Sequence, residues 1–398
     1  MSTNILHRSL MGKSQKEGVY LTIELPQGGY ISFSNAVEYR VNKGRWISLN
    51  AGATTVSAPT SGVYNPFEFR AKLTPAQDVG VGTFTIYNAS SAYLSGNCMS
   101  LLFGDEAAEH TSLVGYDYAF CKLFADVSVD LMVIDYILPA ETLSTSCYEY
   151  MFQNSGISWF PRECLPALNL AQDCYYGMFK NCVNLSGSMA YLDADVLYSG
   201  CYGEMYYGCT SLTSTGNLSA GTLADYCYFA MFQGCTSLTR TFSIGGSYGF
   251  GEQSCSHMYY GCTGLTTAAG IYTDSMGASA CWNMFRNCTN LTSMGGLQCN
   301  YLANDCYSYM FAGCTSLTSA PVLTASTLKA YCYEGMFYGC KKLNSIKMLA
   351  TSVSATNCLK NWVNGVASSG TFTKHPNASL PTGVSGIPSG WTVQTATS

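Results

Sequence analysis

Cysteine is the residue type in this sequence that most invites a chemical role. The chain has 20 cysteines in 398 residues, and most stand in pairs seven or eight positions apart, as Cys227 and Cys235 do. Thiolates bind zinc, and thiols oxidise to disulfides. Zinc sites, however, use cysteines two to four residues apart, with a second pair or histidines nearby. The four histidines follow no recurring spacing: His7, His110, His257 and His375.

The spacing favours a packing role instead. The first cysteine of each pair returns every 25 to 28 residues, with a truncated last copy at Cys358: Cys147, Cys174, Cys201, Cys227, Cys255, Cys281, Cys306 and Cys332. Two cysteines eight apart in a helix are about 12 Å apart along its axis, too far for a disulfide. Free cysteine is among the residues most often buried. We expect a ladder of buried thiols, with disulfides between copies or a metal site as alternatives.

No other group of residues has the spacing of a catalytic site. The sequence lacks a Walker loop, a His-Glu-x-x-His motif and a recurring pair of carboxylates. Asp193, Asp195 and Asp225 are isolated and are typical of caps or solvated loops. We therefore expect no enzyme activity, no cofactor and no metal ligands.

Each cysteine pair belongs to a longer repeat, which reads Cys-Tyr-x-x-Met-Phe-x-Gly-Cys-Thr-Ser-Leu-Thr in its clearest copies. In one copy Cys227, Met231 and Cys235 are four apart and Leu238 follows three later, which is the spacing of one helix face. Gly234 stands where such a helix would end. We expect each copy to form a coil, meaning a short helix, a turn and a short extended segment. Stacked coils would align the cysteines, methionines, phenylalanines and leucines in ladders.

The repeat is irregular around residues 242–281. The glycine-rich stretch 242–251 lengthens one copy and is expected to bulge, either as a functional loop around Tyr248 or as a tolerated surface insertion. In the copies that begin at Cys255 and Cys281 the methionine follows after three residues instead of four. We expect their helices to be one residue shorter.

Tyrosine two positions after the methionine is a candidate binding residue. That position holds Tyr207, Tyr260 and Tyr338 in three copies and Gln, Lys, Arg or Ala in others, which predicts exposure. Exposed tyrosine offers a large contact area at low entropic cost, although it can equally fill the surface between coils. Together with Tyr248, these tyrosines are the predicted ligand-binding residues.

Composition excludes several classes of function. Charged residues make up 11% of the chain, against about a quarter in typical globular proteins. The net charge of -5 and the lack of Lys/Arg clusters argue against nucleic acid. No run of 18 apolar residues predicts a membrane span. The first 14 residues lack the apolar region of a secretory signal. We therefore expect the protein to be made in a reducing cytosol, with its cysteines as free thiols.

Four segments are expected along the chain. Residues 1–18 form an arm that docks on a partner, and 19–95 form a small antiparallel β domain because apolar and polar residues alternate there. Residues 96–357 hold the repeats, and 358–398 form a β-rich C-terminal cap.

The repeats resemble the BspA-type leucine-rich repeats of gut Bacteroidetes and their phages. The resemblance rests on the copies at Cys227 and Cys306, the connecting stretch 320–328 and the end segments 96–105 and 361–374. It covers roughly three quarters of the chain. It implies an α/β repeat fold, a leucine-rich-repeat solenoid with a short helix and a short strand per coil, and a role in adhesion or recognition without catalytic residues.

From this resemblance we expect a fibre or receptor-binding component of a phage particle, made in the host cytoplasm and carried on the virion surface. Its expected partners are other virion proteins, bound through the N-terminal region, and a host surface glycan or protein. A homotrimer is favoured. The alternative is a bacterial cell-surface or secreted adhesin. A recognition domain attached to a hydrolase has no residue in its favour.

Overall fold

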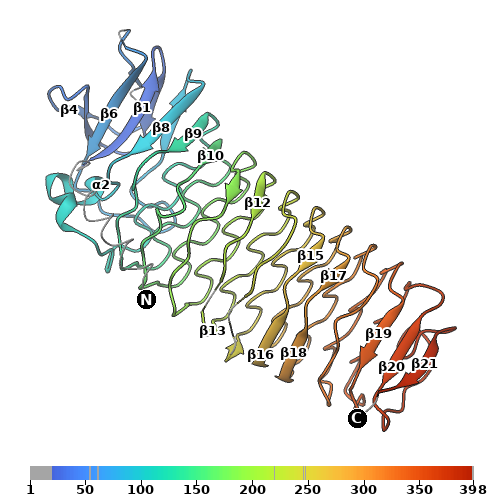
Figure 1. Ribbon diagram of the computed structural model, residues 1–398. Helices are drawn as coiled ribbons and strands as arrows, with labels where there is room; N and C mark the ends of the chain where they lie inside the picture. The colour runs from blue at the N-terminus through green and yellow to red at the C-terminus, as the bar shows by residue number, and fades with distance from the viewer. Residues whose placement is uncertain are drawn as a thin grey trace, which may run out of the picture. The chain divides into compact units, whose positions relative to one another are not determined.

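The computed structural model describes residues 20–52, 55–60, 62–218, 220–244, 246 and 248–396 (Figure 1). The expected arm, residues 1–18, lies outside them. The chain divides into two compact units, Met1–Ala194 and Asp195–Ser398, and each is considered by itself. Both are rich in small β-sheets. In the described residues, helix is confined to α2 (Ser100–Phe103) and the 3-10 helix η1 (Gly104–Glu109).

A seven-stranded sheet dominates the first unit. Its order is β10-β9-β8-β1-β6-β3-β4. The strands are β1 (Leu21–Pro26), β3 (Val37–Val41), β4 (Ile47–Leu49), β6 (Tyr64–Arg70), β8 (Ser91–Ser95), β9 (Asp130–Val133) and β10 (Ile157–Trp159). β1 runs antiparallel to β6 and β8, whereas β9 and β10 join in parallel, so the sheet continues past residue 95. A second sheet has the order β5 (Val56–Ser57), β2 (Tyr30–Phe33) and β7 (Phe84–Tyr87).

The predicted helix in each coil is wrong, because overlapping turns occupy its place. Met231 N donates to Tyr228 O at 3.2 Å, which closes a turn within the coil. Phe232 N, one residue on, donates to Met258 O in the next coil at 2.9 Å. Successive N–H groups alternate in this way, whereas every N–H inside an α-helix bonds to the same helix. We call each such run a turn ladder.

A four-residue period explains why the turn ladder resembles a helix in sequence. Tyr226, Ala230 and Gly234 have φ of 57°, 49° and 75°, so every fourth residue lies in the left-handed region. Cys227 and Met231, one residue after each of the first two, are fully buried. Positions four apart therefore share a side, as they do in a helix of 3.6 residues per turn. The apolar pattern therefore predicts the buried positions correctly, but it does not predict the backbone conformation.

The predicted ladders of inward side chains are confirmed. The repeat methionines from Met151 to Met336 are fully buried, and so are the leucines from Leu212 to Leu343. Aromatic rings stack with centroids 5.4 to 5.7 Å apart and planes within 8° of parallel along one column of the second unit: Tyr206, Phe232, Tyr259, Phe285, Phe311 and Phe337. In the first unit Phe124, Phe152 and Phe179 stack in the same way.

All twenty cysteines are buried free thiols, as predicted for packing residues. The second cysteine of a pair also points at the backbone of the preceding coil. Cys262 Sγ lies 3.0 Å from Phe232 O, and Cys288 Sγ lies 3.1 Å from Tyr259 O. Burial raises the pKa of the Cys262 thiol to about 12. The thiols therefore act as small apolar groups that donate weakly to a carbonyl, and not as thiolates.

The expected shortening at Cys255 and Cys281 is also wrong. Cys255 N donates to Ala280 O at 2.8 Å, and Tyr228 N donates to Ser254 O at 2.9 Å. This register puts Cys255 beside Tyr228, in the tyrosine position of the repeat. Ser254 and Ala280, both fully buried, take the place of the first cysteine. The coil keeps its length, and only the identity of two inward residues changes.

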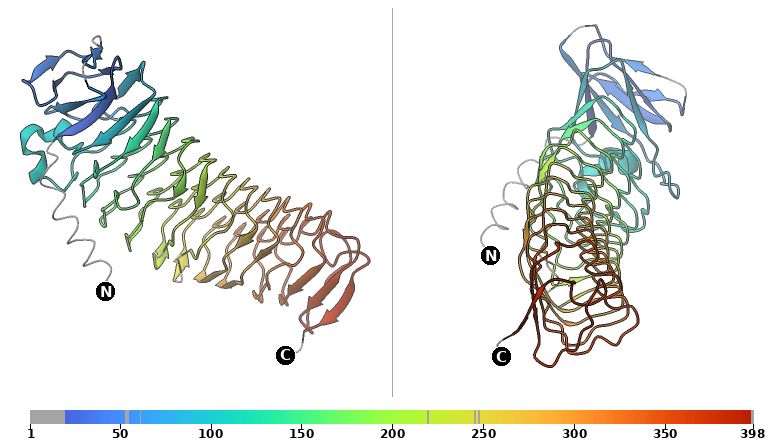
Figure 2. Two further views of the ribbon diagram at one scale, coloured as in Figure 1. Left: turned by 45° about the horizontal axis from the view of Figure 1, so that its top comes forward. Right: turned by 90° about the vertical axis from the view of Figure 1, so that its right-hand side faces the viewer.

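Short strands recur along the second unit, and most of them pair in parallel with a strand of a neighbouring coil. They are β12 (Leu212–Ser214), β13 (Thr222–Leu223), β14 (Gly249–Phe250), β15 (Thr267–Ala268), β16 (Ile271–Ser275), β17 (Ser293–Met294), β18 (Leu297–Tyr301), β19 (Ser345–Met348), β20 (Thr371–Lys374) and β21 (Thr392–Thr395). β13 pairs with β14, β15 with β17, and β16 with β18. Figures 1 and 2 show these coils side by side, with β15 and β17 at one side and β16 and β18 at the other.

The C-terminal end of the second unit is a three-stranded parallel sheet of β19, β20 and β21. Trp362 is fully buried beneath it and donates from Nε1 to Gly386 O at 2.8 Å. Trp391 donates to Ala367 O at 2.7 Å. In the part of the chain that the structure describes, no helix is long and apolar enough to cross a membrane.

Candidate binding surface

The predicted tyrosine position forms one column in the second unit. Backbone bonds such as Gly234 N to Tyr260 O and Gly313 N to Tyr338 O set its register. The column is Tyr207, Gln233, Tyr260, Arg286, Ala312 and Tyr338. Tyr338 is 47% exposed, whereas Tyr207 and Tyr260 are half-buried. The hydroxyl of Tyr260 accepts from Asn287 Nδ2 at 3.3 Å, and that of Tyr207 accepts from Gln233 Nε2 at 3.5 Å.

Tyr248 belongs to a different part of the coil. It is 74% exposed, but the described part of its glycine-rich stretch does not bulge. Gly246 N donates to Ala220 O at 2.6 Å and Tyr248 N donates to Gly221 O at 3.0 Å, so the stretch pairs with the preceding coil and continues into β14. The expectation of a projecting loop is corrected for these residues. Tyr207, Tyr260 and Tyr338 are also separated by other members of their column, so the four tyrosines do not form one site.

The cluster that sequence reasoning missed surrounds His257. The His257 ring packs edge-on against Trp282 with centroids 5.0 Å apart and lies 5.9 Å from the ring of Phe229. Tyr260, the one member that was predicted, lies 5.7 Å away. Trp282 is 37% exposed, so the cluster reaches the surface. Phe229, His257 and Trp282 all occupy the unspecified positions of the repeat, between the buried pairs.

Hydrogen bonds fix the protonation state of His257. Arg286 can only donate, and its Nη1 lies 3.2 Å from Asn283 Oδ1. The amide nitrogen of Asn283 therefore faces His257 Nε2, 3.2 Å away, and Nε2 accepts. His257 Nδ1 then carries the proton and donates to Ser256 Oγ at 2.9 Å, which donates in turn to Trp282 O at 3.3 Å. The chain of bonds is satisfied only by neutral histidine.

The polar network continues from Arg286 into the following coils. The Arg286 guanidinium lies 5.5 Å from the centre of the Tyr309 ring, and Tyr309 donates to Glu334 Oε1 at 3.4 Å. Lys360 Nζ pairs with the same oxygen at 2.9 Å. A Cβ at Gly335 would overlap the Tyr309 ring, so glycine allows the ring to lie against the backbone. The outer side of the turn ladder thus carries aromatic and polar groups in continuous contact.

We expect His257 to make the stability of the protein depend on pH. Burial, and then the charge of Arg286, lower its pKa below the ordinary 6.5. As pH falls below 6.5 the unfolded chain binds the proton first, so stability falls until the folded pKa is passed and is fully present above 6.5. His257→Gln can accept from Asn283 and donate to Ser256 without titrating. Denaturant unfolding between pH 5 and 8 should show a steeper decline in the wild type than in this variant. Parallel declines would contradict the assignment.

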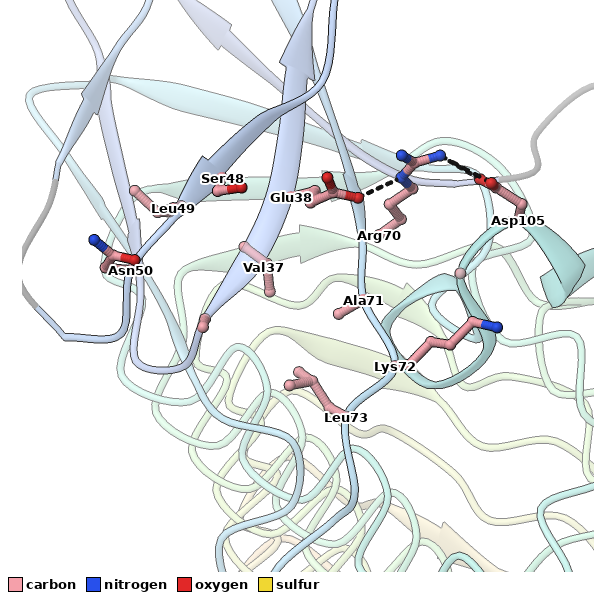
Figure 3. Close-up of a pocket in the computed structure, with 12 residues that line it drawn as sticks. Val37, Glu38, Ser48, Leu49, Asn50, Arg70, Ala71, Lys72, Leu73 and Asp105 are labelled. Atoms are coloured by element: carbon pink, nitrogen blue, oxygen red, sulfur yellow. Dashed lines mark hydrogen bonds and ion pairs between the residues drawn. The ribbon is translucent and has the colours of Figure 1, made fainter.

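A cleft in the first unit is a second candidate (Figure 3). It has a volume of about 520 Å³ and lies among β3, β4 and the segment that follows β6. Arg70 at its rim pairs with Glu38 at 2.8 Å and with Asp105 at 2.7 Å, and its guanidinium lies 4.1 Å from the Trp46 ring. The charges that line the cleft are therefore largely matched within the protein. We regard this cluster as a structural connection between β6 and η1.

The described residues include no cluster of metal-ligating side chains. No group of three His, Cys, Asp or Glu side chains in these ranges could hold a metal ion. Residues 245–249 read Gly-x-Ser-x-Gly, the pattern of a nucleophile elbow. Ser247 lies outside the described residues, and the elbow needs a following helix, whereas β14 and a turn ladder follow. We assign it no role.

Comparison with known proteins adds little. No family model and no curated protein matches the chain. A crystal structure of a leucine-rich repeat protein from Bacteroides ovatus is similar over 63% of this chain and 73% of that one, at 15% identity and a TM-score of 0.26. A likeness at that TM-score supports no conclusion about fold or function.

Proposed function

We propose that the protein is a non-enzymatic adhesion protein built on a leucine-rich-repeat solenoid. The observation that carries the proposal is that each turn ladder has two kinds of position, buried ones with recurring residue types and others with variable residue types. Inward residues mostly repeat from coil to coil as Cys, Met, aromatic and Leu, while the residues at several positions between them vary among the copies of the second unit. Such a scaffold holds variable side chains at fixed spacing, which suits recognition of a surface.

The composition of the outer side supports binding over catalysis. Trp282, Tyr260 and Phe229 give aromatic area around the neutral His257 network, and aromatic residues are enriched where proteins bind partners. Ring contacts with His257, whose own position is fixed by hydrogen bonds, restrict their orientations, which lowers the entropy lost on binding. Its ligand would be a glycan or protein on a cell surface.

For the setting we propose a phage particle, with the chain as a trimeric fibre or receptor-binding component anchored through its N-terminal region. The repeat type and the β-rich N-terminal segment support this. Mass spectrometry and antibody labelling of purified particles should find the chain on the virion surface, and light scattering should give a mass of about three chains. Its absence from particles and presence on a bacterial surface would replace the proposal with a bacterial adhesin.

Adsorption tests the binding face. The purified chain should compete with particles for host cells, and Trp282→Ala should reduce that competition by about tenfold, because an interface tryptophan at the centre of a cluster contributes on the order of 1–2 kcal/mol or more. Tyr87→Ala, an exposed tyrosine of β7 in the first unit, is the control. Equal competition by both variants would exclude the His257 cluster as the contact.

A further inference from the structure

Tyr272 on β16 lies across two glycines and keeps most of its side chain open. A Cβ at Gly270 would come within 2.6 Å of the ring, and one at Gly296 within 2.7 Å of the hydroxyl. Gly296 N donates to that hydroxyl at 3.2 Å. The side chain is nevertheless 58% exposed. Backbone glycines on two coils thus support the ring from below, and a hydrogen bond fixes its position.

Hydrogen-bonding side chains surround this ring on the same face of the strands. Tyr272 lies opposite Gln298 of β18, and Asp274 lies opposite Asn300 in the same register. Asn300 Nδ2 donates to Asp274 Oδ1 at 3.3 Å, and all three polar residues are exposed. Residues two apart on one strand face are about 7 Å apart and neighbouring strands about 5 Å apart. The ring, the carboxylate and both amides therefore lie within reach of one small ligand.

The neighbouring coil extends the patch. The bridge between Phe250 and Met276 sets the register of a third strand, β14, and puts Tyr248, the residue before this strand, level with Asp274. Tyr248 is the most exposed tyrosine of the second unit, and Tyr301 at the end of β18 is nearly as exposed. The patch thus combines the rings of Tyr272 and Tyr248 with one carboxylate. None of its residues is basic.

We propose that this patch binds a neutral carbohydrate, with Tyr272 as the stacking ring. A sugar ring has an apolar face of C–H groups, which an aromatic face attracts, and hydroxyls around its edge. The Asp274 carboxylate accepts hydroxyl protons, and the amides of Gln298 and Asn300 both donate and accept. The one carboxylate and the lack of basic residues disfavour acidic sugars. The inference names the ligand class of the proposed adhesion protein and rests on that role for its biological purpose.

A site this open should bind weakly as a single copy, with a Kd of about 1 mM. The test uses the full chain against an array of neutral oligosaccharides and saturation-transfer NMR with methyl hexosides. Wild-type protein should bind at least one neutral sugar. Tyr272→Ala should weaken that binding at least tenfold, and Tyr272→Phe, which keeps the ring and loses the bond to Gly296, should stay within about threefold. Asp274→Ala, at an exposed position that need not disturb folding, should also weaken it.

Tyr87→Ala removes an exposed tyrosine of β7 in the first unit, outside every candidate binding residue, and should leave sugar binding unchanged. A blank array at millimolar sugar, or equal binding by wild type and Tyr272→Ala, would overturn the inference. So would cell binding that persists after glycans are removed but vanishes in Tyr272→Ala, because the patch would then contact protein. If the array is blank while the chain is on particles and competes for host cells, the adhesion role stands without this site. Sugar binding by a chain absent from particles would overturn the phage setting alone.

Discussion

Phe285→Ala should lower the free energy of unfolding by about 3–5 kcal/mol, the range for deleting a large buried aromatic side chain. Phe285 is 1% exposed and stacks on Tyr259 at 5.4 Å and on Phe311 at 5.7 Å, with planes 2° and 8° from parallel. The two coils are tied by backbone bonds on both sides of the ring, such as Phe285 N to Met310 O at 2.9 Å. They cannot close together over the lost ring, so a cavity remains. Chemical denaturation measures the change.

Tyr338→Ala is a matched control, since it removes an aromatic ring from the outer side of the turn ladder two coils further on. It should change stability by less than about 0.5 kcal/mol, as surface substitutions usually do. Leucine at position 285 fills much of the space. Phe285→Leu should therefore lower the free energy of unfolding by much less than Phe285→Ala does. If Phe285→Ala and Tyr338→Ala had similar effects, the ring column would not be the core of the stack.

Trp362→Ala should have a comparable effect, about 3–5 kcal/mol, at the end of the second unit. Trp362 occupies the methionine position of the last coil and lies 6.0 Å from Phe337 and 6.1 Å from Phe372 of β20. Its loss would leave a cavity beneath the C-terminal sheet and remove the donor to Gly386 O. Terminal elements shield the apolar end of a repeat stack from water. We therefore expect early protease cleavage after residue 358, together with the lower stability.

Trp362→Phe separates the two contributions. It keeps an aromatic ring against Phe337 and loses only the hydrogen bond and part of the volume, so it should recover more than half of the stability. Limited proteolysis and denaturation of both variants give the comparison. A Trp362→Ala protein as stable and as protease-resistant as wild type would mean that the C-terminal sheet does not seal the stack.

The inward half of each coil could be predicted because its residue types repeat. Burial of Met231, Cys235 and Leu238 follows from their recurrence, whatever the backbone does. The backbone could not be predicted, because Tyr226, Ala230 and Tyr309 adopt left-handed conformations that glycine and asparagine favour. Bonds between coils hold these residues there, and no local signal announces a partner that lies 26 positions away.

Most of the binding surfaces could not be predicted either, because their residues lie about one coil apart in the sequence. The exposure of Tyr338 and Tyr248 could be predicted from the variability of their positions and from composition. The contact of His257 with Trp282 requires the register between two coils, which the displaced Cys255 and Cys281 obscured. Tyr272 carried one usable signal, since Gly270 and Gly296 recur at the same place in consecutive coils. Both clusters follow from the backbone register between coils, which brings their residues side by side.

The coil-to-coil hydrogen bonds have a consequence for how such a chain can evolve. Each coil of the second unit offers the same donors to one neighbour and the same acceptors to the other, and exchanges of inward residues such as Ser254 for cysteine leave the pattern intact. Recombination between repeated stretches of the gene could therefore add or remove one whole coil without creating a mismatched junction. The number of coils and the pattern of outer residues would change in a single genetic step, while the hydrogen bonds between coils stay the same.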